Sequence, residues 1–250
     1  MTDMALCTID WRSEVLNKWT SMHVLLPERC EPPYATLYLL HGLSDDYTIW
    51  LRQTRIEMYA RQYPLLVVMP DGYRGFYTDN AAGPAYAKHI GEELVAFIER
   101  TFPAKRTRAA RCLSGNSMGG YGALRIGLGY PDKFISVHSH SGALLHGTKL
   151  WTRNPESKRI FGPRPAGTTH DLVHLVKHAR PLPKLRLDCG TEDFLLAENR
   201  DFHARLRQAG IPHEYVEFPG AHNWDYWDLH IREALVFHAR HLHLQQLPAW

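Results

Sequence analysis

The chain has 250 residues, a length that fits one domain with a large core, and its 44% hydrophobic and 22% charged residues are ordinary for a globular protein, so composition alone names no function. Its formal net charge is only +3 and its densest basic run, residues 105–108, reads as a solvated connection, so we expect no nucleic-acid partner. The sequence contains no apolar window of about eighteen residues and no basic, apolar leader, so we expect no membrane partner and predict a cytoplasmic protein.

The predicted elements alternate between strands and helices along most of the chain. Residues 7–11 and 20–26 are predicted to be antiparallel edge strands. The runs 36–40 and 65–70 are almost wholly apolar, which is typical of strands buried on both faces. Further patterns predict helices at 55–62, 86–101, 171–178, 198–209 and 226–243, and strands ending at 113 and covering 134–142, 184–189 and 213–218.

This alternation predicts an α/β fold with a mostly parallel central sheet, antiparallel N-terminal edge strands and helices on both faces. The sequence has no internal repeat and no domain-sized linker, so residues 1–250 are expected to form a single domain. The irregular segment 144–161 is expected to be a small cap-like insertion that forms the wall of an acyl pocket. The four cysteines lack Cys-x-x-Cys spacing and are expected to be free thiols without redox or zinc chemistry.

The most informative stretch is Gly115-Asn116-Ser117-Met118-Gly119. An apolar run ends at Leu113 just before it, and helical periodicity starts just after it. A nucleophile elbow needs this strand–turn–helix context, with glycines where a Cβ would clash with the neighbouring backbone. We therefore predict that Ser117 Oγ lies at the carboxyl end of the sheet and that the Met118 N–H points at the group that Ser117 attacks.

Two other polar residues follow predicted strands: Asp193 follows the strand at 184–189, and His222 follows the strand at 213–218. With Ser117 they give the order nucleophile, acid, histidine, which is the order that α/β-hydrolases use. Loops at the carboxyl ends of parallel strands converge, so Ser117, Asp193 and His222 are predicted to form a catalytic triad. Asp188 and Glu192 are rivals for the acid. Asp188 lies inside the strand and is expected to be structural or exposed, whereas Glu192 comes one residue early in the turn.

The loop His41-Gly42-Leu43 follows the strand at 36–40. Leu43 is predicted to supply the second oxyanion N–H beside that of Met118. His41 precedes the turn, so it is expected to be a buried histidine that holds the loop.

Four residues are candidates for the substrate pocket, namely Trp50, Tyr77, Asp79 and Trp224. Aromatic rings at such positions could stack on an acyl group or a sugar, although Trp and Tyr belong to protein cores more often. His170, His174 and His178 have the spacing of one helix face, where imidazoles can bind a metal. No carboxylate or cysteine obviously completes that set, so no metal site is predicted.

Several motifs together resemble the Putative esterase family of α/β-hydrolases, and the similarity runs from about Thr8 to His238. They are His41-Gly42-Leu43, Phe76-Tyr77-Thr78-Asp79, the stretch from Gly115 to Leu124, Cys189-Gly190-Thr191-Glu192-Asp193-Phe194, and Pro219-Gly220-Ala221-His222. The family includes tributyrin-type esterases, feruloyl and acetylxylan esterases, S-formylglutathione hydrolases and mycolyltransferases. The chain looks most similar to the small intracellular tributyrin-type esterases, and this resemblance implies hydrolysis of short-chain acyl esters without a cofactor.

The sequence departs from other branches of the family. S-formylglutathione hydrolases usually carry Ser-Gly-Leu-Thr-Cys where this chain has His41-Gly42-Leu43-Ser44-Asp45. Feruloyl and acetylxylan esterases are commonly secreted or joined to carbohydrate-binding modules, features that are missing here. Both remain alternatives to a serine carboxylesterase acting on a small-molecule ester, as do an acyltransferase with the same triad and a non-catalytic binding protein of this fold. The sequence leaves homo-oligomerisation open.

Overall fold

The structure, a computed structural model, describes residues 4–147 and 154–248. Its centre is an eight-stranded sheet with the strand order β1-β2-β4-β3-β5-β6-β7-β8. The strands are β1 Met4–Ser13, β2 Lys18–Pro27, β3 Ala35–Leu40, β4 Leu65–Pro70, β5 Arg111–Asn116, β6 Ser136–His140, β7 Lys184–Gly190 and β8 Glu214–Phe218. β1 pairs with β2, and β2 with β4, in antiparallel fashion. The six strands β4-β3-β5-β6-β7-β8 pair with one another in parallel. This confirms the predicted sheet with its antiparallel N-terminal edge.

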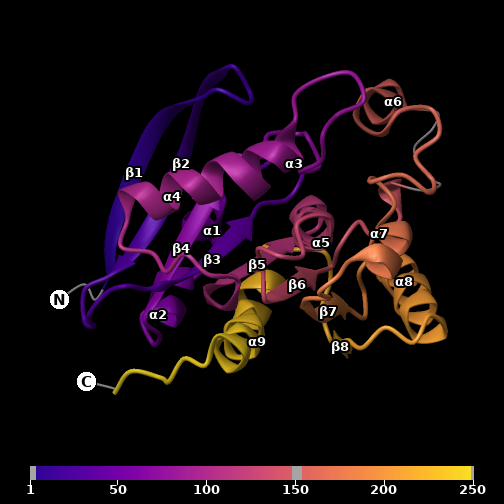
Figure 1. The fold of residues 1–250 in the computed structure, drawn as a ribbon. Coiled ribbons are helices and arrows are strands. Elements are labelled where there is room, and N and C mark those ends of the chain that lie inside the picture. The colour runs from indigo at the N-terminus through magenta and orange to yellow at the C-terminus, as the bar shows by residue number, and fades with distance from the viewer. Residues whose placement is uncertain (1–3, 148–153, 249–250) are drawn as a thin grey trace.

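Helices cover both faces of the sheet, as predicted (Figure 1). They are α1 Ile49–Gln53, α2 Ile56–Ala60, α3 Tyr86–Lys88, the π-helix η1 His89–Leu94, α4 Val95–Thr101, the 3₁₀-helix η2 Arg108–Ala110, α5 Met118–Gly129, α6 Pro155–Phe161, α7 Leu172–His178, α8 Leu196–Gln208 and α9 Trp224–Leu242. Side chains of α3 to α5, α7 and α8 join one hydrophobic cluster, and those of α1, α2 and α9 join the other. The sheet therefore lies between two helical layers.

The sequence of β3 explains why helices pack against both faces of the sheet. Tyr38 and Leu40 belong to the first cluster, whereas Leu37 and Leu39 belong to the second. Successive side chains of a strand point to opposite faces, so an unbroken apolar run supplies two cores at once. All six residues of β3 are buried, as the run at 36–40 predicts.

Two predicted helices differ from the structure. The helix expected at 55–62 is shorter in the structure, where α2 covers Ile56–Ala60. A separate helix that was not predicted, α1, precedes it, with Thr54 and Arg55 between the two. The helix expected at 86–101 is continuous in position but widens into η1 at its centre. There Gly91 packs so tightly that a Cβ on it would lie 2.4 Å from the Tyr130 ring. Bulges of this kind interrupt α-helices without ending them.

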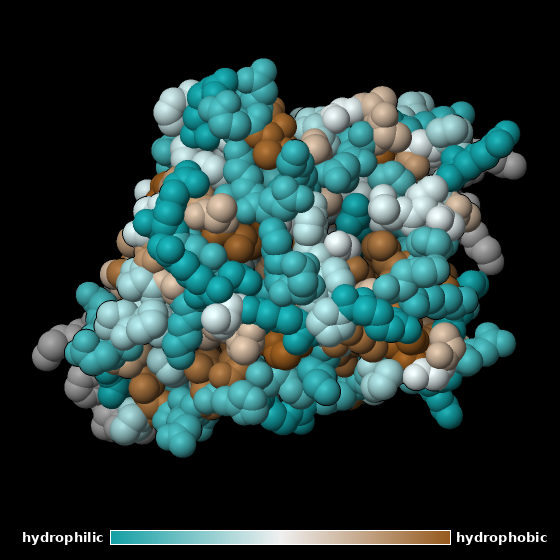
Figure 2. All heavy atoms as spheres, in the orientation of Figure 1, coloured by the Kyte–Doolittle hydropathy of each residue, from teal (hydrophilic) through white to brown (hydrophobic). Residues whose placement is uncertain are grey.

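The surface and the core follow the usual division of residue types. The face drawn in Figure 2 is largely hydrophilic, with hydrophobic side chains visible mainly across its lower half. All four cysteines are free, and Cys112 and Cys189 are buried. Within residues 4–147 and 154–248, we find no helix with the length and apolar character needed to cross a membrane.

Candidate active site

Ser117 stands between β5 and α5 in a strained backbone conformation. Its φ of 53° and ψ of −114° lie where a residue with a side chain is rarely found. The Ser117 N–H donates to the His140 carbonyl at 2.9 Å. A Cβ on Gly119 would lie 2.3 Å from the Leu40 carbonyl oxygen, and one on Gly115 would lie 2.5 Å from the Gly119 backbone. The two glycines therefore let α5 close onto the sheet and hold Ser117 at its carboxyl edge.

His222 links Ser117 to Asp193. The imidazole comes from the loop between β8 and α9, and its Nε2 lies 3.0 Å from Ser117 Oγ. Its Nδ1 lies 2.8 Å from Asp193 Oδ2 and 3.0 Å from Oδ1. The carboxylate belongs to the loop after β7 and is also the acceptor for the Leu195 N–H at 2.7 Å. The structure thus brings together three side chains that are far apart in the sequence.

The environment of Asp193 favours its ionised form. Asp193 is buried, which by itself raises a carboxyl pKa, but hydrogen bonds from His222 and the Leu195 N–H outweigh burial and lower the pKa of Asp193. A negative charge at this position stabilises an imidazolium and keeps the Nδ1 proton of His222 directed at the carboxylate.

The rival carboxylates lie elsewhere. Glu192 is exposed, and its side chain accepts a hydrogen bond from the hydroxyl of Thr191. Asp188 is fully buried rather than exposed, with His138 Nε2 2.8 Å and His140 Nδ1 2.9 Å from its Oδ2. Tyr226 donates its hydroxyl proton to Asp188 Oδ1 at 2.9 Å. Asp188 is therefore structural, one of the two options that the sequence left open.

The cluster of His138, His140 and Asp188 could hold a metal ion, because its ligand atoms lie within 4.8 Å of one another. Interactions between the Asp188 carboxylate and the two histidines also account for these short distances without an ion. Burial raises the pKa of Asp188, but the charges of His140 and His138 outweigh it and hold that pKa far below the usual range. We interpret the cluster as a set of buried polar contacts between β6 and β7. Hydrogen bonds from the Ser117 and Ser141 backbones to these strands connect it to the elbow.

The histidines at 170, 174 and 178 do not share one helix face. His170 precedes α7, and its Nδ1 lies 2.8 Å from the Thr78 hydroxyl. His174 and His178 stack on each other near the end of α7. The helix starts only after the N-cap Asp171, and this separates the first histidine from the other two.

The loop after β3 approaches the serine from the other side. His41 is buried, and its Nδ1–H donates to the Gly42 carbonyl at 2.8 Å while its Nε2 accepts the Gly72 N–H at 2.9 Å. This confirms that His41 holds the loop. Leu43 lines the same cavity as Ser117, and Met118 begins α5, where backbone N–H groups have no partner within the helix.

The cavity beside Ser117 has a volume of about 340 Å³. Residues of the β3 loop, the elbow and the start of α9 line it, namely Gly42, Leu43, Asp45, Ser117, His222, Asn223, Trp224 and Trp227. Trp224, one of the predicted pocket residues, is among them. Asp45, Asn223 and Trp227 were missed, although each is within five residues of a predicted site residue, and this proximity was the available signal.

Contrary to the prediction, three of the four candidate pocket residues do not line this cavity. Trp50 is 1% exposed and donates its Nε1–H to the Leu40 carbonyl, so it packs beneath the site. Tyr77 is fully buried, with its hydroxyl donating to the His41 carbonyl at 3.1 Å. Asp79 accepts the Lys88 N–H through Oδ1 at 3.0 Å, at the start of a helix. The side chain of each of these residues is hydrogen-bonded to a backbone group of the protein, so it is not directed at the cavity.

The expected cap segment is described only in part, because residues 148–153 lie outside the described residues. The described flanks pack inward: Leu144, Leu145, Ile160 and Phe161 belong to the first hydrophobic cluster. No described residue of 144–161 lines the cavity beside Ser117. The described part of this segment therefore does not form the expected pocket wall.

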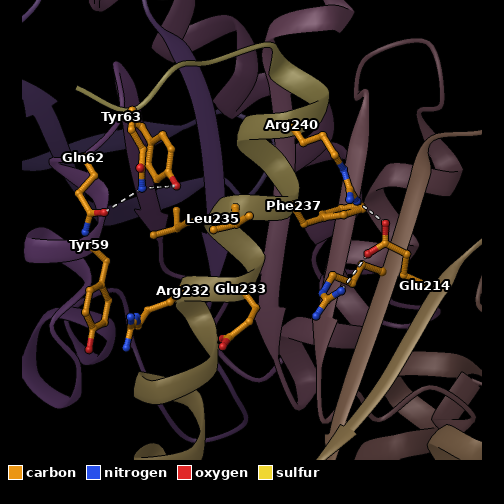
Figure 3. Close-up of a pocket in the computed structure, with 12 residues that line it drawn as sticks. Tyr59, Gln62, Tyr63, Glu214, Arg232, Glu233, Leu235, Phe237 and Arg240 are labelled. Atoms are coloured by element: carbon orange, nitrogen blue, oxygen red, sulfur yellow. Dashed lines mark hydrogen bonds and ion pairs between the residues drawn. The ribbon is translucent and has the colours of Figure 1, made fainter. Parts of the chain in front are cut away.

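A second cavity, of about 320 Å³, lies against α9 away from the candidate site (Figure 3). Arg232 and Leu235 of α9 lie on the side of Tyr59 and Gln62 there, whereas Phe237 and Arg240 lie on the side of Glu214. Glu214 is engaged by Arg186 and Arg240, so charges on this wall are paired within the protein. None of the three linked side chains of the candidate site lines this cavity.

The fold and the site together define a serine hydrolase of the α/β-hydrolase type, and comparison with known proteins agrees. An acetyl esterase of Caldicellulosiruptor saccharolyticus is 33% identical over 257 aligned residues, which cover 92% of this chain and 97% of that protein. The substrate-bound structure of FphF, a fluorophosphonate-binding serine hydrolase of Staphylococcus aureus, superposes with a TM-score of 0.87 at 31% identity, covering 94% and 98% of the two chains.

A crystal structure of the S-formylglutathione hydrolase FrmB from Staphylococcus aureus is also similar, with a TM-score of 0.84, 32% identity and the same coverage of 94% and 98%. The chain matches the family described as Putative esterase over residues 13–238. It therefore belongs to the Putative esterase family. It has the α/β-hydrolase fold and is a serine carboxylic ester hydrolase.

Proposed function

We propose that this protein is a carboxylesterase that hydrolyses short-chain acyl esters through Ser117, His222 and Asp193. The observation that carries the proposal is the bridging position of His222, with Nε2 3.0 Å from Ser117 Oγ and Nδ1 2.8 Å from Asp193. Donor and acceptor distances of this size allow proton transfer between the groups.

In the proposed mechanism, His222 accepts the Ser117 proton while Ser117 Oγ attacks the ester carbonyl. The backbone N–H groups of Leu43 and Met118 stabilise the oxyanion of the tetrahedral intermediate. His222 then protonates the leaving alcohol, and an acyl-enzyme on Ser117 remains. Water, activated by the same imidazole, hydrolyses this ester and releases the acid. No step calls for a cofactor.

The size of the cavity supports a short acyl chain. Its volume of about 340 Å³ lies near the lower limit for small-molecule sites, and the rings of Trp224 and Trp227 occupy one wall. The name of the acetyl esterase relative agrees with this choice. One specific similarity favours a second candidate, S-formylglutathione hydrolysis, because a relative of 32% identity carries that name.

A rate series tests both candidates. We expect kcat/KM for p-nitrophenyl esters to peak at acetate or butyrate and to fall towards octanoate, with slower turnover of S-formylglutathione. If the enzyme prefers S-formylglutathione, the proposed catalytic residues stand, but the proposed substrate is wrong.

The Ser117→Ala variant tests the nucleophile. We expect it to lose at least about 10⁴-fold in kcat, because removal of a serine nucleophile abolishes the acyl-enzyme route. Circular dichroism and thermal melting would check that the variant is folded. A folded Ser117→Ala protein that keeps wild-type esterase activity would overturn the proposal.

We further propose a cytoplasmic location. The four cysteines, Cys7, Cys30, Cys112 and Cys189, are unpaired, as is usual in a reducing compartment. Fractionation of the source cells would test this.

A further inference from the structure

Phe194 occupies an unusual position beside His222. It follows Asp193 directly, and 76% of its surface is exposed. Its ring centroid lies 4.4 Å from that of the His222 imidazole, with 47° between the planes. Trp227, itself buried, meets the same imidazole edge-on at 4.9 Å. The imidazole is thus packed between a buried tryptophan that also lines the cavity and an exposed phenylalanine.

Exposure by itself would mean little, because single hydrophobic side chains are common on protein surfaces. The position of Phe194 is what carries weight. Its ring lies against the group that exchanges protons with the substrate, and most of its apolar surface is still free to be covered by a ligand.

The proposed chemistry indicates which part of the ester, the acyl group or the alcohol, lies beside the Phe194 ring. His222 Nε2 must reach the oxygen of the leaving alcohol in order to protonate it, so the alcohol lies beside the imidazole. The acyl carbon is bonded to Ser117, in the cavity lined by Leu43 and Trp224. Because Phe194 packs on the imidazole and is not among the residues that line this cavity, we infer that its ring faces the alcohol rather than the acyl group.

We propose that Phe194 is a platform for the leaving group and that it selects esters of flat, uncharged alcohols, such as benzylic or naphthylmethyl alcohols. This inference rests on the proposed esterase function. Apolar contact with an alcohol ring covers the exposed face of Phe194 and holds the leaving oxygen near His222 Nε2.

The charges around His222 favour an uncharged alcohol. Asp45 lines the cavity, and Asp225 is exposed three residues after His222. Among the described residues that line this cavity, there is no lysine or arginine. An anionic leaving group would therefore find no lysine or arginine among the described lining residues to compensate its charge.

The test compares acetate esters that differ only in the alcohol: ethyl, benzyl and 2-naphthylmethyl acetate. These alcohols have similar basicity, and all three esters form the same acetyl-enzyme, so alcohol binding is the main variable. For the wild-type enzyme, we expect kcat/KM to rise along the series. In Phe194→Ala, we expect a loss of about tenfold on the two aromatic esters and a clearly smaller loss on ethyl acetate.

Phe194→Leu should recover part of the loss, because it restores apolar surface without a flat ring. Trp19→Ala is the matched control, since Trp19 is 69% exposed on β2, with β4 and β3 between it and β5. It should leave all three rates unchanged. Carboxylate-substituted benzyl acetate should be a poorer substrate than benzyl acetate.

Equal losses on all three esters in Phe194→Ala would contradict the inference, because they would mean that Phe194 only positions His222. Unchanged rates on all three would also contradict it. In either case Ser117-dependent hydrolysis would remain. If wild-type and Ser117→Ala proteins hydrolyse these esters equally, the proposed function itself fails.

Discussion

Two carboxylates five residues apart in the sequence have different surroundings. Asp193 lies in the loop beyond β7 and reaches His222, whereas Asp188 lies inside β7 and meets His138, His140 and Tyr226. The pKa of each carboxyl is lowered despite burial, because hydrogen bonds and histidine charges stabilise the anion. A lowered carboxyl pKa therefore does not identify the catalytic acid here; contact with the proton-transferring histidine does.

We expect Asp193→Asn to lower kcat by about 10³–10⁴ while the protein stays folded. The amide nitrogen would face His222 Nδ1 and favour the tautomer that carries its proton on Nε2, so the imidazole could no longer accept the Ser117 proton. Steady-state kinetics on p-nitrophenyl acetate would measure the loss.

Glu192→Gln is the matched control for this substitution, because it neutralises the neighbouring carboxylate, which is exposed. It should retain activity within about twofold, as is usual for surface positions. The reverse pattern, a large loss in Glu192→Gln and little in Asp193→Asn, would identify Glu192 as the acid.

At the scale of elements, the approach of α5 to β3 places the serine. A Cβ on Gly119 would lie 2.3 Å from the Leu40 carbonyl oxygen and 2.7 Å from that of His41, and both are backbone atoms. The same two residues lead into the loop that carries Leu43. A shift of α5 would therefore move both predicted oxyanion donors relative to each other.

We expect Gly119→Ala to lower both the melting temperature and kcat, because the new methyl group must push α5 away from β3. Overpacking of this kind typically costs about 1–3 kcal/mol in the free energy of unfolding. Gly129→Ala, at the end of the same helix, is the control, since its Cβ would meet only the flexible end of Arg125. Equal effects of the two substitutions on kcat would refute this account of the elbow.

At the scale of the whole molecule, buried histidines make stability depend on pH. Burial and the charges of neighbouring histidines lower the pKa of His138 to about 4 and that of His238 well below its usual value. In the unfolded chain, both would titrate near pH 6.5. Below that pH, the unfolded state binds protons that the folded state does not, so stability falls as the pH falls.

We therefore expect the free energy of unfolding, measured by urea titration, to decrease between pH 7 and pH 5. Each of the two histidines contributes up to about 1.4 kcal/mol per pH unit below the unfolded pKa. His238→Gln should reduce the slope, because one of these protons no longer binds to the unfolded state. An unfolding free energy that stays constant over this range would contradict the expectation.

Much of the fold and of the candidate site could be read from local patterns. Apolar runs predict β3 and β4 because a strand buried on both faces needs them, and the glycines around Ser117 predict a tight turn because of the lack of a Cβ. The order of Ser117, Asp193 and His222 after successive strands predicts their meeting, since the carboxyl ends of parallel strands share one edge. These inferences depend on chain order and residue type alone.

The sequence does not show which aromatic side chains are covered by other segments of the chain. Tertiary packing decided that Trp50 and Tyr77 satisfy backbone carbonyls in the core, whereas Trp224 and Trp227 line the cavity. It also left Phe194 exposed against the His222 imidazole. The same residue type serves as core or as site according to which neighbours cover it, and three-dimensional packing alone sets those neighbours.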